Sequence, residues 1–323
     1  MNTSRRTLLA ALALGCAPVA FAQQAWPSKP LRIVVPFTAG GPADGLARQL
    51  GAHMSTELGQ QVLVDNKAGA GGTLGAAEVA RSSPDGYTLL FSGTGALVIF
   101  PALSPKMPYN ADRDLIPVGQ AISTPMVIVV GRNSPFKDLG ALLKHAKANP
   151  GKVNFASAGA GTTTQMGAEL LRQEAGVELT HVPYRGAAPA LNDVIAGTAD
   201  MMVADVSAVV AFVKGGQLRP LAVTSPARST VLPDVPTTAE AGLRNVVAST
   251  WYGFLVPART PPEVVSRLNA ALNKAVQHPD SVAFLKAQGV LPAVGSPEAF
   301  GQLMKAESAK WGTLAKTVGA KLD

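Results

Sequence analysis

Apolar and polar positions along the chain follow two alternating patterns. Short apolar runs at residues 31–35, 62–64 and 88–91 predict buried strands, and residues 46–58 carry apolar side chains at helical spacing. Turns rich in glycine or proline, such as residues 84–86, separate these segments. Strand, turn and helix repeat with the spacing of right-handed βαβ crossovers, so the pattern predicts an α/β fold with a mainly parallel sheet.

The pattern changes near the middle of the chain. Two apolar runs, residues 115–118 and 126–130, follow each other without a clear helix between them. A second α/β series then begins, with strands expected at residues 153–156, 179–182, 201–204 and 218–223. After an extended run at residues 251–256, helices are expected at residues 262–277, 281–288 and 297–318.

These two series predict two doubly wound α/β domains joined by two crossing strands. The last helices have no strands of the second series left to cover, so we expect the chain to return to the first domain. We therefore place domain one at residues 23–124 plus 247–323 and domain two at residues 125–246. Strands near residues 118–130 and 251–256 would form the hinge, and the cleft between the domains would hold a ligand.

The first residues have the composition of an export signal. Arg5 and Arg6 precede an apolar stretch at residues 8–19, and Ala20-Phe21-Ala22 supplies a cleavage pattern of small residues. The apolar stretch is shorter than the roughly 18–20 residues that span a bilayer. We therefore expect a signal peptide at residues 1–22, cleaved after Ala22, and an exported protein.

The paired arginines leave both the general and the twin-arginine export routes open. Ala13 stands where a lipoprotein site usually has leucine, which argues against lipid attachment at Cys16. Because Cys16 is the only cysteine, the mature chain is expected to have no disulfide. Loss of the signal arginines lowers the net charge from +7 to +5, which weakly favours anionic ligands. The basic residues are scattered, so we expect no nucleic-acid partner.

The residue patterns of catalytic, metal and cofactor sites are missing. The four histidines show no i, i+4 pairing, so no metal site is expected. Residues 69–74 approach a dinucleotide fingerprint, but Leu74 replaces its third glycine. No paired acid and base and no partnered nucleophile are recognisable, so we expect neither catalysis nor a cofactor.

Four glycine-rich loops with small hydroxyl residues follow predicted strands, at residues 37–41, 67–73, 92–95 and 157–163. Backbone N–H groups at the start of a helix attract an anion, and glycine allows it to approach closely. Each loop alone also fits a simple tight turn, but four loops at one sheet edge favour a binding site. The candidate ligand contacts in the first and third loops are Phe37, Thr38, Ala39, Gly40, Gly41, Ser92 and Thr94.

Further candidates lie beside predicted strand ends. Asp44 and Asp205 stand near the starts of helices, where an N-cap role and a ligand contact are both open. Tyr184 and Arg185 would offer a hydroxyl and a bidentate carboxylate clamp, although Arg185 equally suits a surface salt bridge. Residues 251–252, Trp and Tyr, are expected to pack in the hinge.

Motifs along nearly the whole mature chain resemble those of one known family. They include PFTAGGPAD at residues 36–44, VDNKAGAGG at 64–72, HVPYRG at 181–186, LPDVPT at 232–237 and WYG at 251–253. On these motifs the chain resembles the Bug-like periplasmic substrate-binding proteins of tripartite tricarboxylate transporters.

The resemblance implies a two-domain periplasmic-binding-protein clamshell, a location in the periplasm, and delivery of the ligand to membrane permease subunits. It also implies that residues 37–41, with Asp44, hold a ligand carboxylate through backbone groups and water. Contacts from domain two are implied for Thr162, Thr163 and Gln165. The chain departs from the family at Asp205, where asparagine is frequent, and at residues 97–99, which are more apolar than usual.

Other functions stay open at this point. A sensor would bind the same ligand but signal to a membrane kinase, whereas a periplasmic enzyme on this scaffold would need groups that the chain lacks. The small carboxylate ligand could be a dicarboxylate, an amino acid or an aromatic acid. We expect the protein to be a monomer.

Overall fold

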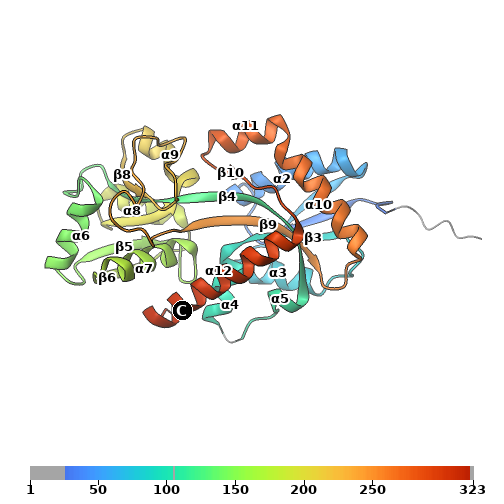
Figure 1. Cartoon of the computed structure of the whole chain (residues 1–323), viewed down its shortest axis with the longest axis horizontal. Coiled ribbons are helices and arrows are strands. Elements are labelled where there is room, and N and C mark those ends of the chain that lie inside the picture. Colours follow the sequence, from blue (N-terminus) through green and yellow to red (C-terminus); the bar gives the residue numbers. More distant parts are fainter. Residues whose placement is uncertain (1–25, 105, 321–323) are drawn as a thin grey trace, which may run out of the picture.

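The computed structural model describes residues 26–104 and 106–320, and the expected signal peptide lies outside them. Figure 1 shows two α/β halves side by side, connected by the long strands β4 (Leu115–Gly131) and β9 (Ser249–Pro257). The other strands are β1 (Leu31–Val35), β2 (Val62–Asn66), β3 (Thr88–Gly93), β5 (Val153–Ser157), β6 (Leu179–Pro183), β7 (Met201–Asp205), β8 (Leu218–Val223) and β10 (Leu291–Pro292).

Helices fill the connections between the strands. They are α2 (Pro42–Leu58), α3 (Thr73–Ala80), α4 (Phe100–Leu103), α5 (Ala111–Asp114), α6 (Leu139–Ala148), α7 (Thr163–Ala175), α8 (Ala187–Ala196), α9 (Val206–Lys214), α10 (Pro262–Gln277), α11 (Pro279–Ala287) and α12 (Pro297–Val318), with short turns η1 (Ala70–Gly72) and η2 (Gly95–Ile99). None of the helices in the described part of the chain is long and apolar enough to cross a membrane.

The strands form one ten-stranded sheet with the order β2-β1-β3-β9-β4-β7-β5-β6, and β8 and β10 pair with β4. Strand β1 is parallel to β2 and β3, and β5 is parallel to β6 and β7. Strands β4 and β9 run antiparallel to each other and to their outer neighbours β7 and β3. Each half therefore has its own parallel strands, which confirms the predicted doubly wound fold with two crossing strands.

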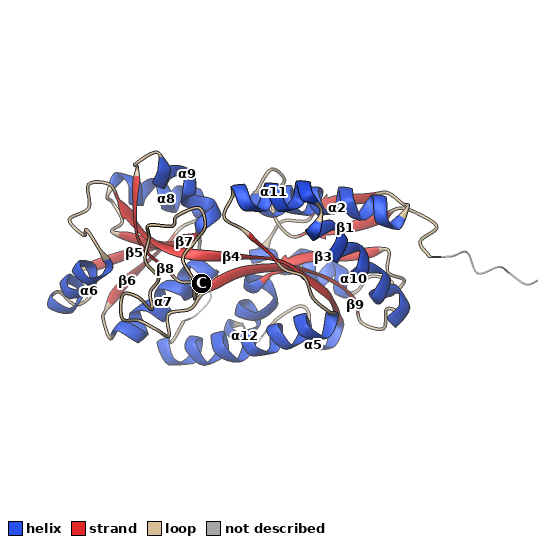
Figure 2. Ribbon diagram, turned by 45° about the horizontal axis from the view of Figure 1, so that its top comes forward, coloured by secondary structure: helices blue, strands red, loops and turns tan. Residues whose placement is uncertain are grey.

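Strand β4 is a single strand of 17 residues where the sequence indicated two separate apolar runs. Up to Pro125 it pairs with β9, and from Met126 onward it pairs with β7 and β8. Register shifts next to Pro117 and Gln120 absorb the residues that interrupt the apolar pattern. As a result, β4 belongs to both halves, and Figure 2 shows it running between them beside β9.

A continuous apolar cluster reaches through both halves. It contains Leu90 from β3, Ile128 from β4 and Phe155 from β5. Helix α12 adds Phe300 and Trp311 to this cluster and contacts α4, β4 and α7. The C-terminal helix therefore lies along both halves, as Figures 1 and 2 show.

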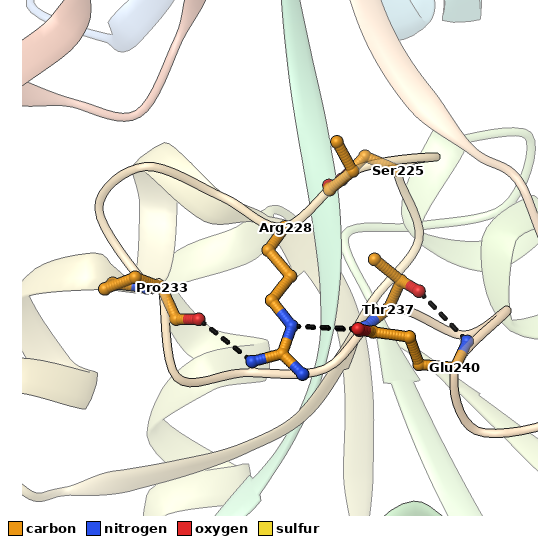
Figure 3. A network of polar contacts seen from close by, with 6 residues as sticks. Ser225, Arg228, Pro233, Thr237 and Glu240 are labelled. Atoms are coloured by element: carbon orange, nitrogen blue, oxygen red, sulfur yellow. Dashed lines mark hydrogen bonds and ion pairs between the residues drawn. The ribbon is translucent and has the colours of Figure 1, made fainter.

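A polar network orders the long connection between β8 and β9 (Figure 3). Arg228 Nε lies 3.0 Å from Glu240 Oε2, and Arg228 Nη1 donates to the Pro233 carbonyl at 3.3 Å. Thr237 N donates to Glu240 Oε2 at 2.7 Å, while Glu240 N donates to Thr237 Oγ1 at 3.0 Å. This reciprocal pair is a capping-box arrangement, and it holds the connection before the chain enters β9.

Candidate functional site

A cavity of about 430 Å³ lies between the two halves. Residues at the starts of α2, α7, α8 and α9 border it, together with residues of the crossing strands β4 and β9. In doubly wound sheets the loops after the parallel strands meet at one edge, and ligands bind there. The cavity is therefore the candidate ligand site.

The structure brings part of the predicted site to this cavity. The predicted residues that line it are Phe37, Thr38, Gly41, Thr94, Thr162, Thr163 and Asp205. The predicted residues that do not line it are Ala39, Gly40, Asp44, Ser92, Gln165, Tyr184 and Arg185. Two residues of the second group, Asp44 and Gln165, form hydrogen bonds that hold the loops carrying the lining residues.

Asp44 fixes the shape of the first loop. The N-cap of α2 is Gly41, and Asp44 lies inside the first turn of the helix. The Gly40 N–H donates to Asp44 Oδ2 at 2.9 Å, and Arg48 and Asn66 donate to the same carboxylate. Gly40 has a φ of +78°, in the left-handed region that favours glycine. Asp44 is thus neither the N-cap nor a residue of the cavity surface; it holds the loop.

The first loop keeps several backbone donors available. Gly40 N–H is bonded to Asp44, and Gly41 N–H points to the Thr38 carbonyl at 3.4 Å. The N–H groups of Thr38, Ala39, Ala43 and Asp44 have no acceptor among the described residues. Such donors at the N-terminus of a helix, where the helix dipole is positive, suit an anion.

The stabilisation that Asp44 gives to this loop depends on pH, because it requires the ionised carboxylate. Hydrogen bonds from Arg48 and from the Gly40 N–H lower the pKa of Asp44 from 3.8 to about 2. Because the folded-state pKa is depressed, the stabilisation is fully present above pH 3.8 and is lost as the pH falls through about 2.

Asp44→Ala should therefore lower the free energy of unfolding by about 1–3 kcal/mol at neutral pH, since it leaves the Gly40 N–H without its acceptor. The difference from the wild type should shrink as the pH falls toward about 2. Urea unfolding at several pH values measures both effects. A difference that stays constant over this range would contradict the role given to the carboxylate charge.

The second half presents the N-terminus of α7. Thr162 is the N-cap, and its Oγ1 accepts from Gln165 N at 3.4 Å and donates to the Gly159 carbonyl at 2.6 Å. The N–H groups of Thr163 and Thr164, both cavity residues, have no acceptor in the described part of the chain. Gln165 is buried and its Oε1 accepts from Gly161 N at 2.8 Å, so it braces the loop. A second positive helix end thus faces the first across the cavity.

Asp205 ends β7 and occupies the N-cap position of α9, but its side chain does not cap that helix. Thr250 Oγ1 on β9 donates to Asp205 Oδ1 at 2.7 Å and lies 2.9 Å from Thr163 Oγ1 on α7. Burial raises the pKa of Asp205 to about 6, and the hydrogen bond from Thr250 opposes that rise. Burial and the nearby Asp205 charge also raise the pKa of the Tyr252 phenol.

The remaining predicted residues have structural partners or point elsewhere. Tyr184 Oη donates to Asp193 Oδ2 at 2.6 Å, within the second half. Arg185 is exposed and makes no ion pair with a described residue. Thr94 Oγ1 accepts from Trp251 N at 3.0 Å and ties β3 to β9. Ser92 is fully buried, and its hydroxyl has no partner among the described residues.

The sequence did not identify some residues of the crossing strands as part of the site. Thr124 on β4 and Thr250 and Tyr252 on β9 line the cavity. Thr124 and Thr250 are directly paired in the register of these strands. Side chains alternate along a strand, so Thr250 and Tyr252 share one face while Trp251 lies on the other. That alternation was the available signal. Trp251 is buried and packs as expected for the hinge, and Tyr252 also packs there, with its ring 5.5 Å from that of Phe91, while it lines the cavity.

A group of metal-ligating type lies away from the cavity. Ligand atoms of His53, His278 and Asp280 lie within 4.8 Å of one another. The two imidazole rings stack at 3.8 Å with an interplanar angle of 24°, and His278 Nδ1 accepts from Asp280 N at 3.3 Å. Nearly parallel stacked rings do not direct their nitrogen lone pairs to one point, which disfavours a shared ion in this conformation.

Comparisons with known proteins agree with this architecture. A family model described as "Tripartite tricarboxylate transporter family receptor" matches residues 46–320, which confirms the resemblance seen in the motifs. The chain is 45% identical over 314 residues to the "UPF0065 protein in tcbD-tcbE intergenic region" of Pseudomonas sp. (strain P51), covering 96% of this chain and 93% of that protein.

Two solved structures are also similar. One is an R. palustris protein with adipate, which has 32% sequence identity and a TM-score of 0.84 and covers 92% of this chain and 100% of that chain. The other is MatC from Rhodopseudomonas palustris with bound malate, which has 33% identity and a TM-score of 0.80 and covers 90% of this chain and 99% of that chain. The chain therefore belongs to the tripartite tricarboxylate transporter receptor family of periplasmic solute-binding proteins.

Proposed function

We propose that this protein captures a small carboxylate in the cavity between its two halves and delivers it to the membrane permease subunits of a tripartite transporter. One observation carries the proposal: the N-termini of α2 and α7, from opposite halves, expose unpaired backbone N–H groups beside one cavity. Two positive helix ends attract an anion without any cationic side chain.

The composition of the cavity supports capture rather than chemistry. None of the described residues that line it is Lys, Arg or His, and the hydroxyls come from threonine, serine and tyrosine. Backbone donors hold a carboxylate without the paired acid and base or the activated nucleophile that catalysis needs. The adipate and malate in the two similar structures are small carboxylates of the kind proposed here.

Capture of this kind also implies motion. We propose the division at residues 23–124 plus 247–323 and 125–246, with β4 and β9 as the hinge and residues 1–22 removed on export. A ligand that touches both helix ends interacts fully only with the closed form, so binding shifts the population toward closure.

Calorimetry and small-angle scattering on the mature chain should test binding and closure together. The probes are dicarboxylates, amino acids and aromatic acids, and the control for each is the derivative in which every carboxylate is replaced by an amide, which removes the negative charge. We expect at least one carboxylate to bind, its amide to fail, and the radius of gyration to fall on saturation. Failure of every carboxylate, or equal binding of an acid and its amide, would refute anion capture. Delivery is tested by measuring uptake of the bound acid in cells that lack the permease subunits. If the receptor delivers its ligand to these subunits, uptake should be lost.

A further inference from the structure

Asp205 is the one ionisable carboxyl group among the described residues that line the cavity. None of these lining residues has a basic side chain that could pair with it. It lies where β7 meets α9, in the second half, and its neighbour in the sheet register is Met126 of β4. The carboxyl group therefore contributes the principal negative charge to a site otherwise built from positive helix ends.

The contacts of Asp205 leave part of its hydrogen-bonding capacity unused. Oδ1 accepts from Thr250 Oγ1 at 2.7 Å, whereas Oδ2 has no donor among the described residues. An ionised carboxylate accepts several hydrogen bonds, and one hydroxyl satisfies only a part of that capacity. A buried charge with an open lone pair is stabilised strongly by a donor that arrives with the ligand.

We propose that Asp205 determines specificity by accepting a protonated amine of the ligand, so that the receptor selects a small zwitterion over a dicarboxylate. The inference rests on the proposed capture of a carboxylate and adds the second end of the ligand. Backbone N–H groups of the first loop and of α7 hold the carboxylate, and Asp205 holds the ammonium group.

Electrostatics distinguishes the two ligand classes. Burial already disfavours the charged form of Asp205, whose pKa is raised to about 6. A second ligand carboxylate placed beside it adds like-charge repulsion, so a dianion binds only if Asp205 takes up a proton. An ammonium group has the opposite effect: it favours the ionised carboxyl group and lowers its pKa. The two classes therefore differ in the sign of the proton exchange that accompanies binding.

Few other groups near Asp205 can contribute to that exchange. The side chains beside it are the hydroxyls of Thr163 on α7, Ser207 on α9 and Thr250 on β9, and the phenol of Tyr252 on β9. Of these, only Tyr252 titrates, and its pKa is raised above its ordinary value of 10.0. Proton exchange between about pH 5 and about pH 7.5 that disappears in Asp205→Asn is therefore assigned to Asp205, and the titration of the ligand itself is measured separately.

The experiment is calorimetry with paired probes: the dicarboxylates from succinate to adipate, and for each the ω-amino acid with the same number of carbon atoms. We compare affinities within the pair whose chain length binds most tightly. At about pH 7.5 the wild type should bind the amino acid of that pair about ten- to a hundredfold more tightly than the dicarboxylate, as expected for one charge-assisted hydrogen bond. Its affinity should fall as the pH drops below about 6, with proton release on binding. Dicarboxylates should instead bind with proton uptake.

Asp205→Asn should reverse the preference within the pair. Asparagine keeps the carbonyl oxygen that accepts from Thr250 but removes the charge, so the amino acid loses affinity and the dicarboxylate gains it. The control is Asp138→Asn, which removes the same charge from the exposed N-cap of α6 and leaves a residue that also caps. That variant should behave as the wild type does.

The outcomes separate this inference from the proposed function. If dicarboxylates bind the wild type more tightly and Asp205→Asn leaves the order unchanged, carboxylate capture stands but the role of Asp205 is refuted. If neither series binds the wild type or Asp205→Asn, while both proteins unfold cooperatively on heating, capture of small carboxylates itself is refuted for ligands of this size.

Discussion

Gly40→Val should weaken carboxylate binding by about 1.5–3 kcal/mol for each backbone hydrogen bond that the first loop gives up. Gly40 has a φ of +78°, and a β-branched residue in that region is a strained outlier. A Cβ at this position meets no atom within 4 Å, so the conformation alone is responsible for the effect. The loop should relax by turning Gly40, which breaks its hydrogen bond to Asp44 and moves the N–H groups of Thr38 and Ala39 away from the ligand.

The matched control is Gly59→Val at the other end of the same helix. Gly59 has a φ of +67°, and a Cβ there also meets nothing within 4 Å, but it lies outside the cavity. Gly59→Val should lose about 1–2 kcal/mol of free energy of unfolding from left-handed strain, and Gly40→Val should lose at least as much, because it also breaks the hydrogen bond to Asp44. Only Gly40→Val should lose affinity in calorimetry. Equal affinities for the two variants would show that the loop conformation does not matter for binding.

Gly93→Ala should destabilise the fold by several kcal/mol, more than the about 1–3 kcal/mol typical of an extra methyl group in a packed core. The added Cβ would lie 2.2 Å from the backbone carbonyl oxygen of Trp251, which is a strand atom and cannot turn aside as a side chain does. Gly93 pairs with Tyr252 where β3 meets β9, so relief requires these strands to separate. Separation also displaces the cavity residues Thr250 and Tyr252.

Gly95→Ala, two positions further on, is the control for this effect. A Cβ at Gly95 meets no atom within 4 Å, and the residue lies in a helical turn where alanine is preferred to glycine. Its free energy of unfolding should equal or exceed that of the wild type. Urea unfolding of both variants checks the contrast, and similar midpoints would show that β3 and β9 can move apart freely at Gly93.

Much of the fold was predictable because its signals are local. Helices α10 and α12 begin and end at the residues that the sequence pattern indicated, since each starts with proline and carries a regular apolar stripe. Strand β10 was not predicted, because it has two residues and forms only by pairing with β4, about 170 residues earlier in the chain. Long-range pairing also turned two apolar runs into the single strand β4.

The candidate site was predictable at the level of loops but not of atoms. Glycine-rich turns after strands do reach the cavity, as the sheet rule requires. Which N–H groups remain free was not predictable, because the bond between Gly40 and Asp44 depends on loop dihedral angles. The position of Asp205 beside Thr250 likewise depends on a contact between residues 45 apart in sequence.

Helix α12 has a consequence for affinity itself. It packs against α4 of the first half and against α7 of the second half. Its apolar residues, Phe300 and Trp311 among them, therefore adjoin parts that the proposed closure moves relative to each other. An apparent dissociation constant equals the intrinsic one divided by the fraction of molecules in the competent form. Substitutions where α12 contacts α4 and α7 can therefore change the apparent dissociation constant without contacting the ligand. Evolution of the receptor can thus adjust the ligand concentration at which it becomes saturated separately from its selectivity among ligands.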